Sequence, residues 1–180
     1  MKTAVIVTII MALICIVGGV FLVLCGFFYT PQAKQGETGP YYYAYEDFTG
    51  SYSRTYPVFS RVYAKLNDAG IKNSIGIGIY YDDPETVPAE KLRSSCGSVI
   101  DKADEAKAAA AGLKTGYIGR TKSVIVEFPV RINFAYMFAP RKIYPVLKKY
   151  LKENNIQNGA PYEIYDVANK KMMTVIPILK

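Results

Sequence analysis

The residue with the clearest potential for binding chemistry is Glu163, within the segment Pro161-Tyr162-Glu163-Ile164-Tyr165. The aromatic and apolar neighbours predict a strand, and alternation along a strand puts Glu163 and Tyr165 on one face. A carboxylate beside a tyrosine ring suits a flat cationic ligand, through ion pairing and cation–π attraction. The same pattern is also typical of an exposed glutamate on a half-solvated sheet, and composition alone favours that alternative.

The composition excludes several kinds of chemistry. The chain contains no histidine, which rules out Ser-His-Asp and Cys-His catalysis and removes the commonest zinc ligand. Cys15 and Cys25 lie in an N-terminal apolar run, so Cys96 remains alone, without a disulfide partner and with the expected role of a small buried side chain. Asp82 and Asp83 lack the spacing of a calcium loop and are expected in a turn. We therefore expect no metal site and no cofactor.

Two glycines interrupt another predicted strand, in which Ile75, Ile77 and Ile79 alternate with Gly76 and Gly78. Glycines weaken a strand unless another group approaches its backbone closely. That group is either a ligand or a packed helix, and the spacing favours the helix.

The net charge of +7 is spread along the chain in short basic pairs. These pairs are Arg141-Lys142, Lys148-Lys149 and Lys170-Lys171. Spaced pairs are typical of a solvated face, and contact with anionic lipid headgroups is the second interpretation. We expect no nucleic-acid partner, because no recognition motif accompanies the charge.

The N-terminal run from Ala4 to Phe28 carries no charged residue and is long enough to span a bilayer as a tilted helix. A cleaved signal peptide is the alternative, but its apolar region is shorter, and Gly26-Phe27-Phe28-Tyr29 is a poor cleavage site. A lipoprotein site at Cys25 is disfavoured because the bulky Leu24 precedes it.

We therefore predict three segments: a retained single-pass membrane anchor over residues 1–29, a polar linker over 30–39 and a folded domain over 40–180. The flanking charges favour, only slightly, a domain on the extracytoplasmic side of the membrane.

The domain shows the same order of elements twice: strand, helix, strand, strand. Hydrophobic periodicity and turn residues define these segments. In the first unit these are the strand Tyr41–Phe48, a helix ending near Ala69, a strand around Ile75–Ile79 and the strand Lys91–Ile100. In the second unit they are the strand Ser123–Val130, the helix Pro140–Asn154, the strand Pro161–Val167 and the strand Lys171–Leu179. A short surface helix over Asp101–Gly112 joins the halves. The pattern predicts an α+β fold with a pseudo-two-fold antiparallel sheet, helices on one face, and a groove where the halves meet.

A local similarity supports the duplication. Tyr56-Pro57-Val58-Phe59 corresponds to Tyr144-Pro145-Val146-Leu147, and we expect each segment to lie early in its helix because proline is tolerated in the first turn.

Several motifs together resemble the GyrI-like small-molecule-binding domain, of the superfamily that includes AraC effector-binding and SOUL-like domains. They are Tyr45–Tyr52, Gly76–Pro84, Val87-Pro88 with Leu92–Gly97, and Pro161–Tyr165 with Val175–Ile178. The resemblance covers residues 40–180. It implies a duplicated fold with a central cleft that binds amphipathic, often cationic, small molecules. It also implies that Glu163 is a cleft glutamate, and that Tyr52, Tyr81 and Tyr165 belong to the cleft wall.

The combination of an apolar N-terminal segment with this domain is similar to the single-pass receptors of endoplasmic-reticulum autophagy. The segments around Lys142–Pro145 and Tyr150–Glu153 also resemble that subgroup. Those receptors carry a long disordered tail with a motif that binds an autophagy protein. Because this sequence ends at Lys180, we do not expect their receptor activity to transfer, and a protein partner stays unknown.

Three functions follow, in order of preference. The first is a sensor or sequestering module for hydrophobic cations, with Glu163 as the counter-charge and membrane lipid around the N-terminal helix. The second is a hydrolase of small electrophilic compounds, with Glu163 as general base and a tyrosine as proton donor. The third is a protein-interaction adaptor at the membrane, which an occluded groove would favour. We regard an enzymatic activity as the less expected outcome.

Overall fold

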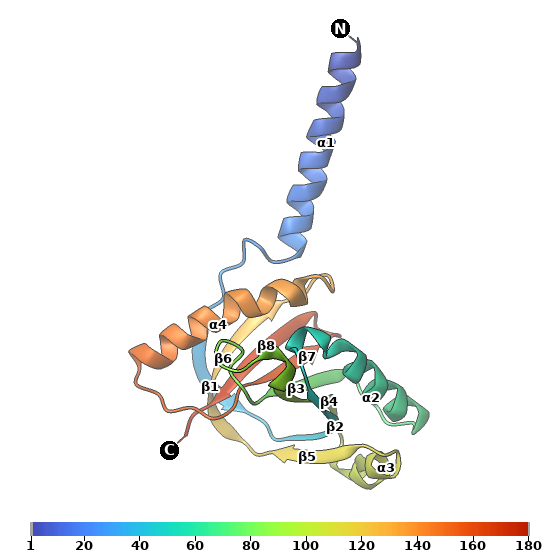
Figure 1. The fold of residues 1–180 in the computed structure, drawn as a ribbon, viewed down its shortest axis with the longest axis vertical. Helices are drawn as coiled ribbons and strands as arrows, with labels where there is room; N and C mark the ends of the chain where they lie inside the picture. The colour runs from blue at the N-terminus through green and yellow to red at the C-terminus, as the bar shows by residue number, and fades with distance from the viewer. Residues whose placement is uncertain (1, 180) are drawn as a thin grey trace.

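A computed structural model describes residues 2–179 of the chain, with the backbone alone for Lys2. Figure 1 shows one long helix standing away from a body in which helices cover a sheet. The helices are α1 (Lys2–Leu24), α2 (Tyr56–Asp68), α3 (Glu105–Ala110) and α4 (Ala135–Glu153). The strands are β1 (Ala33–Thr38), β2 (Tyr41–Thr49), β3 (Ile75–Tyr80), β4 (Arg93–Ile100), β5 (Lys114–Ile118), β6 (Thr121–Pro129), β7 (Tyr162–Asp166) and β8 (Lys171–Pro177).

The strands form one antiparallel sheet in the order β1-β6-β8-β7-β3-β4-β2-β5. The central pair, β7 and β3, joins the two halves of the sheet. On one side of this pair lie β4 and β2 of the first unit, and on the other side lie β8 and β6 of the second. The predicted α+β fold with duplicated strand-helix-strand-strand units is therefore confirmed.

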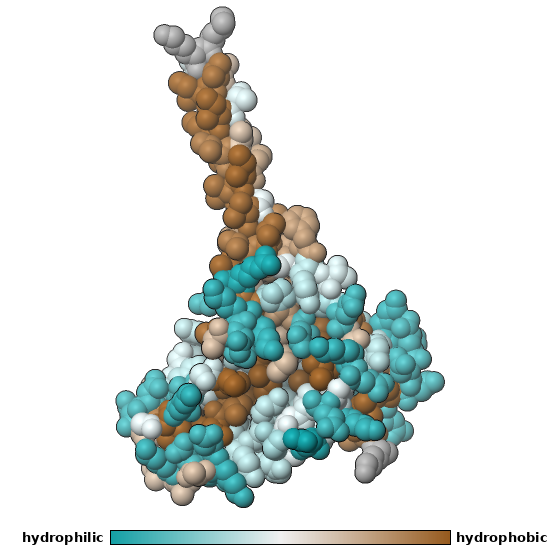
Figure 2. Space-filling view, turned by 180° about the vertical axis from the view of Figure 1, so that it is seen from behind, coloured by the Kyte–Doolittle hydropathy of each residue, from teal (hydrophilic) through white to brown (hydrophobic). Residues whose placement is uncertain are grey.

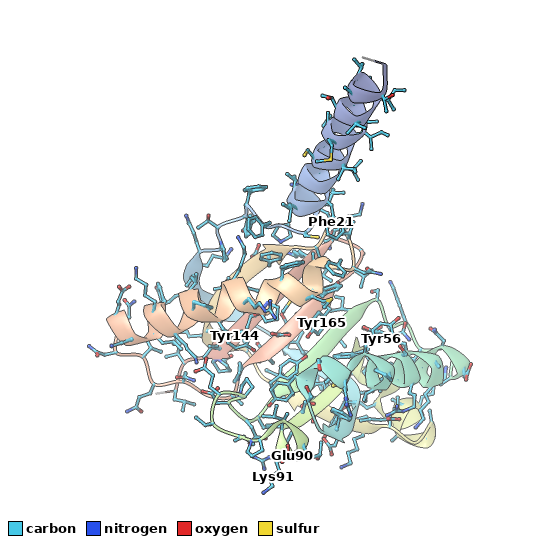
Figure 3. All side chains as sticks on the ribbon, turned by 45° about the horizontal axis from the view of Figure 1, so that its top comes forward. Phe21, Tyr56, Glu90, Lys91, Tyr144 and Tyr165 are labelled. Carbon is cyan, nitrogen blue, oxygen red and sulfur yellow. The ribbon has the colours of Figure 1, made fainter. Side chains whose placement is uncertain are left out.

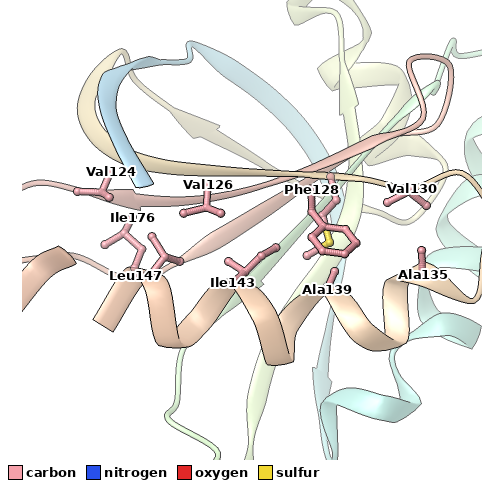
Figure 4. Packing of buried hydrophobic residues seen from close by; sticks show 10 residues of the cluster. Val124, Val126, Phe128, Val130, Ala135, Ala139, Ile143, Leu147 and Ile176 are labelled. Carbon is pink, nitrogen blue, oxygen red and sulfur yellow. The ribbon is translucent and has the colours of Figure 1, made fainter. Parts of the chain in front are cut away.

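Helix α4 packs on the second half of the sheet through small and branched residues spaced four apart. Figure 4 shows this stripe facing β6 and β8. The stripe consists of Ala135, Ala139, Ile143 and Leu147, and it meets Val124, Val126, Phe128 and Ile176. Helix α2 packs on the first half in the same way, through Val62 and Leu66 against Ala44 and Ile100. Spacing of four residues keeps each stripe on one side of its helix, so other sides of α2 and α4 remain available for contacts over the centre of the sheet.

The face of the sheet without helices is buried too, because the sheet curls on itself. Strand β1 at one edge leads directly into β2 near the other edge, and β5 leads in the same way into β6. The two short links touch, since a Cβ atom on Gly39 would lie 2.6 Å from the carbonyl oxygen of Gly119. Inside the curl lies a cluster formed by Tyr43, Ile77, Ile79, Tyr162, Ile164 and Val175.

The segment predicted as a linker, 30–39, differs from expectation because Ala33–Thr38 form β1, paired along their length with β6. Strand β5 was not predicted either. Both are edge strands, and β1 has the polar sequence AKQGET, with only its last residue buried. Edge strands of this kind carry polar residues on exposed faces, so they lack the apolar alternation by which strands are recognised.

Helix α4 begins at Ala135, not at Pro140 as predicted, so Pro140 and Pro145 lie inside it. Each proline removes one backbone hydrogen bond. The helix continues because its buried stripe packs on β6 over its whole length. In α2, by contrast, Pro57 lies in the first turn, as predicted. Tyr144-Pro145 and Tyr56-Pro57 therefore do not occupy equivalent places.

Helix α1 is apolar except near its N-terminal end and projects from the body. Figure 2 shows it as a hydrophobic rod on a mostly hydrophilic surface. The span Thr3–Leu24 has a mean hydropathy of 3.0, and none of it is buried in the body. By length and composition this helix is able to cross a membrane, a property that it shares with signal sequences.

Candidate functional site

Glu163 lies at the junction of the two halves, where its backbone pairs with that of Gly78. Its exposed fraction is 4%. Directly opposed residues in an antiparallel pair share a face, so Glu163 points to the same side as Gly78, the side covered by α2 and α4. Figure 3 shows Tyr144 on α4 and Tyr165 on β7 in the space between these helices. Composition alone favoured an exposed Glu163, whereas the family resemblance implied a glutamate in the cleft. The structure places the side chain in the interior.

Tyrosine hydroxyl groups hold the carboxylate. Tyr144 donates a hydrogen bond to Oε1 of Glu163 over 3.2 Å, and Tyr165 donates one to Oε2. The hydroxyl of Tyr165 also lies 2.8 Å from that of Tyr80. Because Tyr165 gives its proton to Glu163, Tyr80 is the donor in this second bond. Tyr80 and Tyr165 thus form a chain of donors that ends on one carboxylate oxygen, and Tyr144 donates separately to the other. Both sets of hydrogen bonds stabilise the negative charge.

The two glycines of β3 make room for this network. A Cβ atom on Gly76 would lie 2.5 Å from the hydroxyl of Tyr63 on α2, and one on Gly78 would lie 3.0 Å from the hydroxyl of Tyr80. The close approach expected over these glycines is therefore made by tyrosine side chains, one of them from a helix. Any larger residue at either position would displace a ring.

Aromatic rings pack between the helices over the centre of the sheet. The ring of Tyr165 lies between Phe59 of α2 and Tyr136 of α4, with centroid distances of 5.4 Å and 5.6 Å in edge-on geometry. Edge-to-face packing of this kind is favourable beyond the area it buries. The groove predicted at the junction of the halves is thus occupied by the protein's own side chains, and Tyr165 is the central one.

Burial raises the pKa of Glu163 to about 7, against the opposing effect of the hydrogen bonds from Tyr165, Tyr144 and Tyr80. Burial and the nearby carboxylate likewise raise the pKa values of Tyr165 and Tyr144. None of the ion pairs between described residues includes Glu163. This buried acid therefore has hydrogen-bond donors but no cationic partner within the part of the chain that the structure describes.

Replacing Tyr165 with phenylalanine is expected to raise the pKa of Glu163 further, by about one unit, because the charged carboxylate loses a donor. The measurement is a ¹³C NMR titration of glutamate carboxyl groups, with the Glu163 signal assigned by its absence in Glu163→Gln. Tyr52→Phe is the control, since the hydroxyl of Tyr52 donates to the carbonyl groups of Asp82 and Arg93. An unchanged or lower pKa in Tyr165→Phe would contradict the proposed hydrogen bond.

The structure brings together three of the four predicted site residues. Glu163 and Tyr165 are in direct contact, and Tyr52 packs its ring on Tyr80 with 4.8 Å between centroids. Tyr81 lies elsewhere: its hydroxyl is 2.9 Å from Oγ of Ser95, which donates to Asp47.

The register explains the separation of Tyr81. Ser95 pairs with Ile79, whose side chain lies in the cluster inside the curl, on the opposite face from Gly78 and Glu163. Tyr81, bonded to Ser95, belongs to that other side of the sheet.

Sequence reasoning missed Tyr80 and Tyr144. A signal for Tyr80 was present, because it continues the alternation of Gly76 and Gly78 and so shares their face. The sequence marks Tyr144 only as the first residue of the tetrapeptide that corresponds to Tyr56-Pro57-Val58-Phe59. Its contact with Glu163 depends on how α4 crosses the sheet, which no local pattern reveals.

Comparison with known proteins extends this picture. Among solved structures, the C-terminal domain of EcmrR superposes with a TM-score of 0.61 at 16% identity, covering 83% of this chain and 98% of that one. An uncharacterized conserved protein from Listeria innocua gives a TM-score of 0.58 at 11% identity, covering 88% and 98%. This chain therefore shares the fold of these two proteins. A hydrolase from Listeria innocua also shares this fold, with a TM-score of 0.52 at 11% identity and the same coverage.

At the level of sequence, no family model matches the chain. Testis-expressed protein 264 homolog from Mus musculus is 29% identical over 133 residues, which covers 68% of this chain and 40% of that protein. The Homo sapiens protein is 28% identical over 97 residues, covering 49% and 31%. The chain thus spans less than half the length of these curated relatives.

Proposed function

We propose that this protein is a membrane-tethered binding domain for a small, flat, amphipathic cation, held between the two repeats with Glu163 as its counter-charge. The observation that carries the proposal is the burial of Glu163 with tyrosine donors and no cationic partner among the described residues. A buried carboxylate without a cationic partner costs stability, and carboxyl groups with shifted pKa values cluster at functional sites. A bound cation would offset that cost.

Binding requires the tyrosine network to move, because Tyr165 and Tyr144 occupy the place that a ligand would take beside the carboxylate. Rotation of Tyr165 away from Glu163 would leave a space between Phe59 and Tyr136, two rings able to stack on a flat molecule. The measured affinity is then lower than the affinity of the open state, because only the fraction of molecules in the open state is able to bind. We therefore expect a sensor or sequestering protein that binds after side-chain rearrangement.

The membrane part of the proposal rests on α1. Its apolar length suits a retained single-pass anchor over residues 1–29, as in the membrane-anchored subgroup that the sequence resembles. We propose an extracytoplasmic domain from the flanking charges. Because Ala33–Thr38 belong to the sheet, the folded domain follows the anchor after only a few residues.

The test compares a cationic xanthene dye with an anionic dye of the same shape, added to the full chain in lipid nanodiscs. We expect binding of the cationic dye alone, and a loss of about tenfold or more in Glu163→Gln, because one buried charge pair is removed. Glu127→Gln is the matched control, since Glu127 is a partly exposed residue paired with Lys34. Equal affinity of both dyes, or unchanged affinity in Glu163→Gln, would refute the proposal.

A protein-interaction adaptor is the second candidate, and the closed groove specifically favours it. In that case neither dye binds, and substitutions at Glu163 change stability without changing any ligand affinity.

The hydrolase alternative predicts a different result: turnover of an electrophilic ester that stops in Glu163→Gln. The same dye and ester measurements therefore separate all three functions.

A further inference from the structure

The lower end of α1 is packed against the beginning of α4. The ring of Phe21 lies 5.4 Å from that of Phe134, which immediately precedes α4. Figure 3 shows Phe21 at the base of α1, where the helix meets the body. Lys142 of α4 donates hydrogen bonds to the carbonyl groups of Phe27 and Tyr29, just beyond the end of α1. The anchor helix is therefore attached to the body by specific contacts.

These contacts determine the depth of the neighbouring residues. Phe21 lies one helical turn before Leu24, the last residue of α1. The helix of 23 residues is about 34 Å long at about 1.5 Å per residue, close to the thickness of about 30 Å of a hydrocarbon core. Phe134, in contact with Phe21, is consequently held at the level of the last turn of α1. In a bilayer that α1 crosses, this level would be the boundary between hydrocarbon and headgroups.

The surface around this point is apolar although it belongs to the body. Phe134 is 45% exposed, Met137 is 66% exposed, and Phe28 is 68% exposed. Arg131 is exposed beside them, and with Phe28 and Tyr29 it lines a hollow of about 170 Å³ between the end of α1 and the end of β6. Aromatic rings and a cation are the residues that settle at a membrane interface.

We propose that the turn over residues 25–29 and the segment over residues 131–138 form one lipid-contacting surface, embedded in the interface of the bilayer that α1 crosses. The inference rests on the proposed membrane anchor and adds that the body is docked on the bilayer instead of hanging from a flexible tether. The occupant is the bilayer itself, because the surface is continuous with α1 and lies at its boundary level. Lipid acyl chains cover Phe28, Phe134 and Met137, and Arg131 contacts headgroup phosphate.

The chain contains no tryptophan, so each single tryptophan variant carries one fluorophore of this kind. The full chain is reconstituted into phosphatidylcholine vesicles whose lipids are brominated either close to the headgroup or near the end of the acyl chain. Met137→Trp and Phe28→Trp report on the proposed surface. Val17→Trp reports on insertion of α1, and Tyr117→Trp, on edge strand β5, is the control for the part of the body away from α1.

We expect bromines close to the headgroup to quench Met137→Trp and Phe28→Trp, with a blue shift of their emission, while Tyr117→Trp loses no emission. Val17→Trp is expected to be quenched mainly by the deep bromines. If Val17→Trp is quenched and the two surface reporters are not, the anchor holds and the docking proposal is overturned. If Val17→Trp is not quenched either, the anchor and the docking proposal both fail.

Discussion

The folded domain is expected to lose stability as the pH rises from about 4.5 to about 7, and Glu163→Gln is expected to abolish most of this loss. In the unfolded chain Glu163 ionises near its ordinary pKa of 4.5, whereas burial raises the pKa to about 7 in the folded protein. Between these values the folded state binds more protons than the unfolded state, so stability falls with pH. The difference corresponds to about 3 kcal/mol at pH 8.

The amino-acid composition makes this measurement clear to interpret. The chain has no histidine, the side chain that ordinarily titrates in this range. Denaturant unfolding at pH 5 and pH 8, followed by tyrosine near-ultraviolet circular dichroism, gives the two free energies of unfolding. Glu127→Gln is the control, because Lys34 lowers the pKa of Glu127 and removes its titration from this interval. Parallel pH profiles for wild type and Glu163→Gln would show that Glu163 is not a buried acid.

Gly97→Ala is expected to destabilise the domain by about 3 kcal/mol or more, the upper range for overpacking. Gly97 in β4 faces Tyr45 of β2, and an added Cβ atom would lie 2.8 Å from the Cα atom of Tyr45 and still closer to the carbonyl oxygen of Ala44. These are backbone atoms of the neighbouring strand, so no side-chain rotation relieves the overlap. Strand β2 has to move away from β4, which breaks ladder hydrogen bonds next to the core under α2.

Gly159→Ala is the matched control for this substitution. A Cβ atom there would meet only side-chain atoms, the nearest at 3.6 Å from Leu179, an ordinary van der Waals distance. Thermal unfolding of the two variants beside the wild type measures the difference. A melting temperature of Gly97→Ala equal to that of Gly159→Ala would mean that β2 and β4 are not packed as closely as described.

Local patterns predicted the duplicated units because the helices and strands of these units are marked by residues close together in the sequence. Alternating isoleucines identified β3, and a stripe with a first-turn proline identified α2. The edge strand β1 was missed because its residues are polar, and its pairing with β6 connects positions about 90 residues apart. The start of α4 was misplaced because Pro140 resembles a helix beginning, while the packing of Ala135 and Ala139 on the sheet extends the helix beyond it.

The candidate site shows the same division between local and long-range information. Strand alternation was enough to place Glu163 and Tyr165 on one face. The local pattern did not reveal the burial of Glu163, which only the family resemblance implied, because residues that cover it come from α4 and from the other repeat. Tyr81 was chosen in place of Tyr80, an error of one position that alternation converts into the opposite face of the sheet.

The contact between Tyr136 and Tyr165 has a consequence for how a ligand would travel. Tyr136 precedes Met137, a member of the surface proposed to rest in lipid, and its ring reaches the central ring of the groove. Amphipathic cations accumulate in bilayers far above their aqueous concentration. A molecule dissolved in the membrane would thus reach Tyr165 from the side of Tyr136, next to the proposed lipid-contacting surface. Its capture would depend on membrane partitioning more than on diffusion through water.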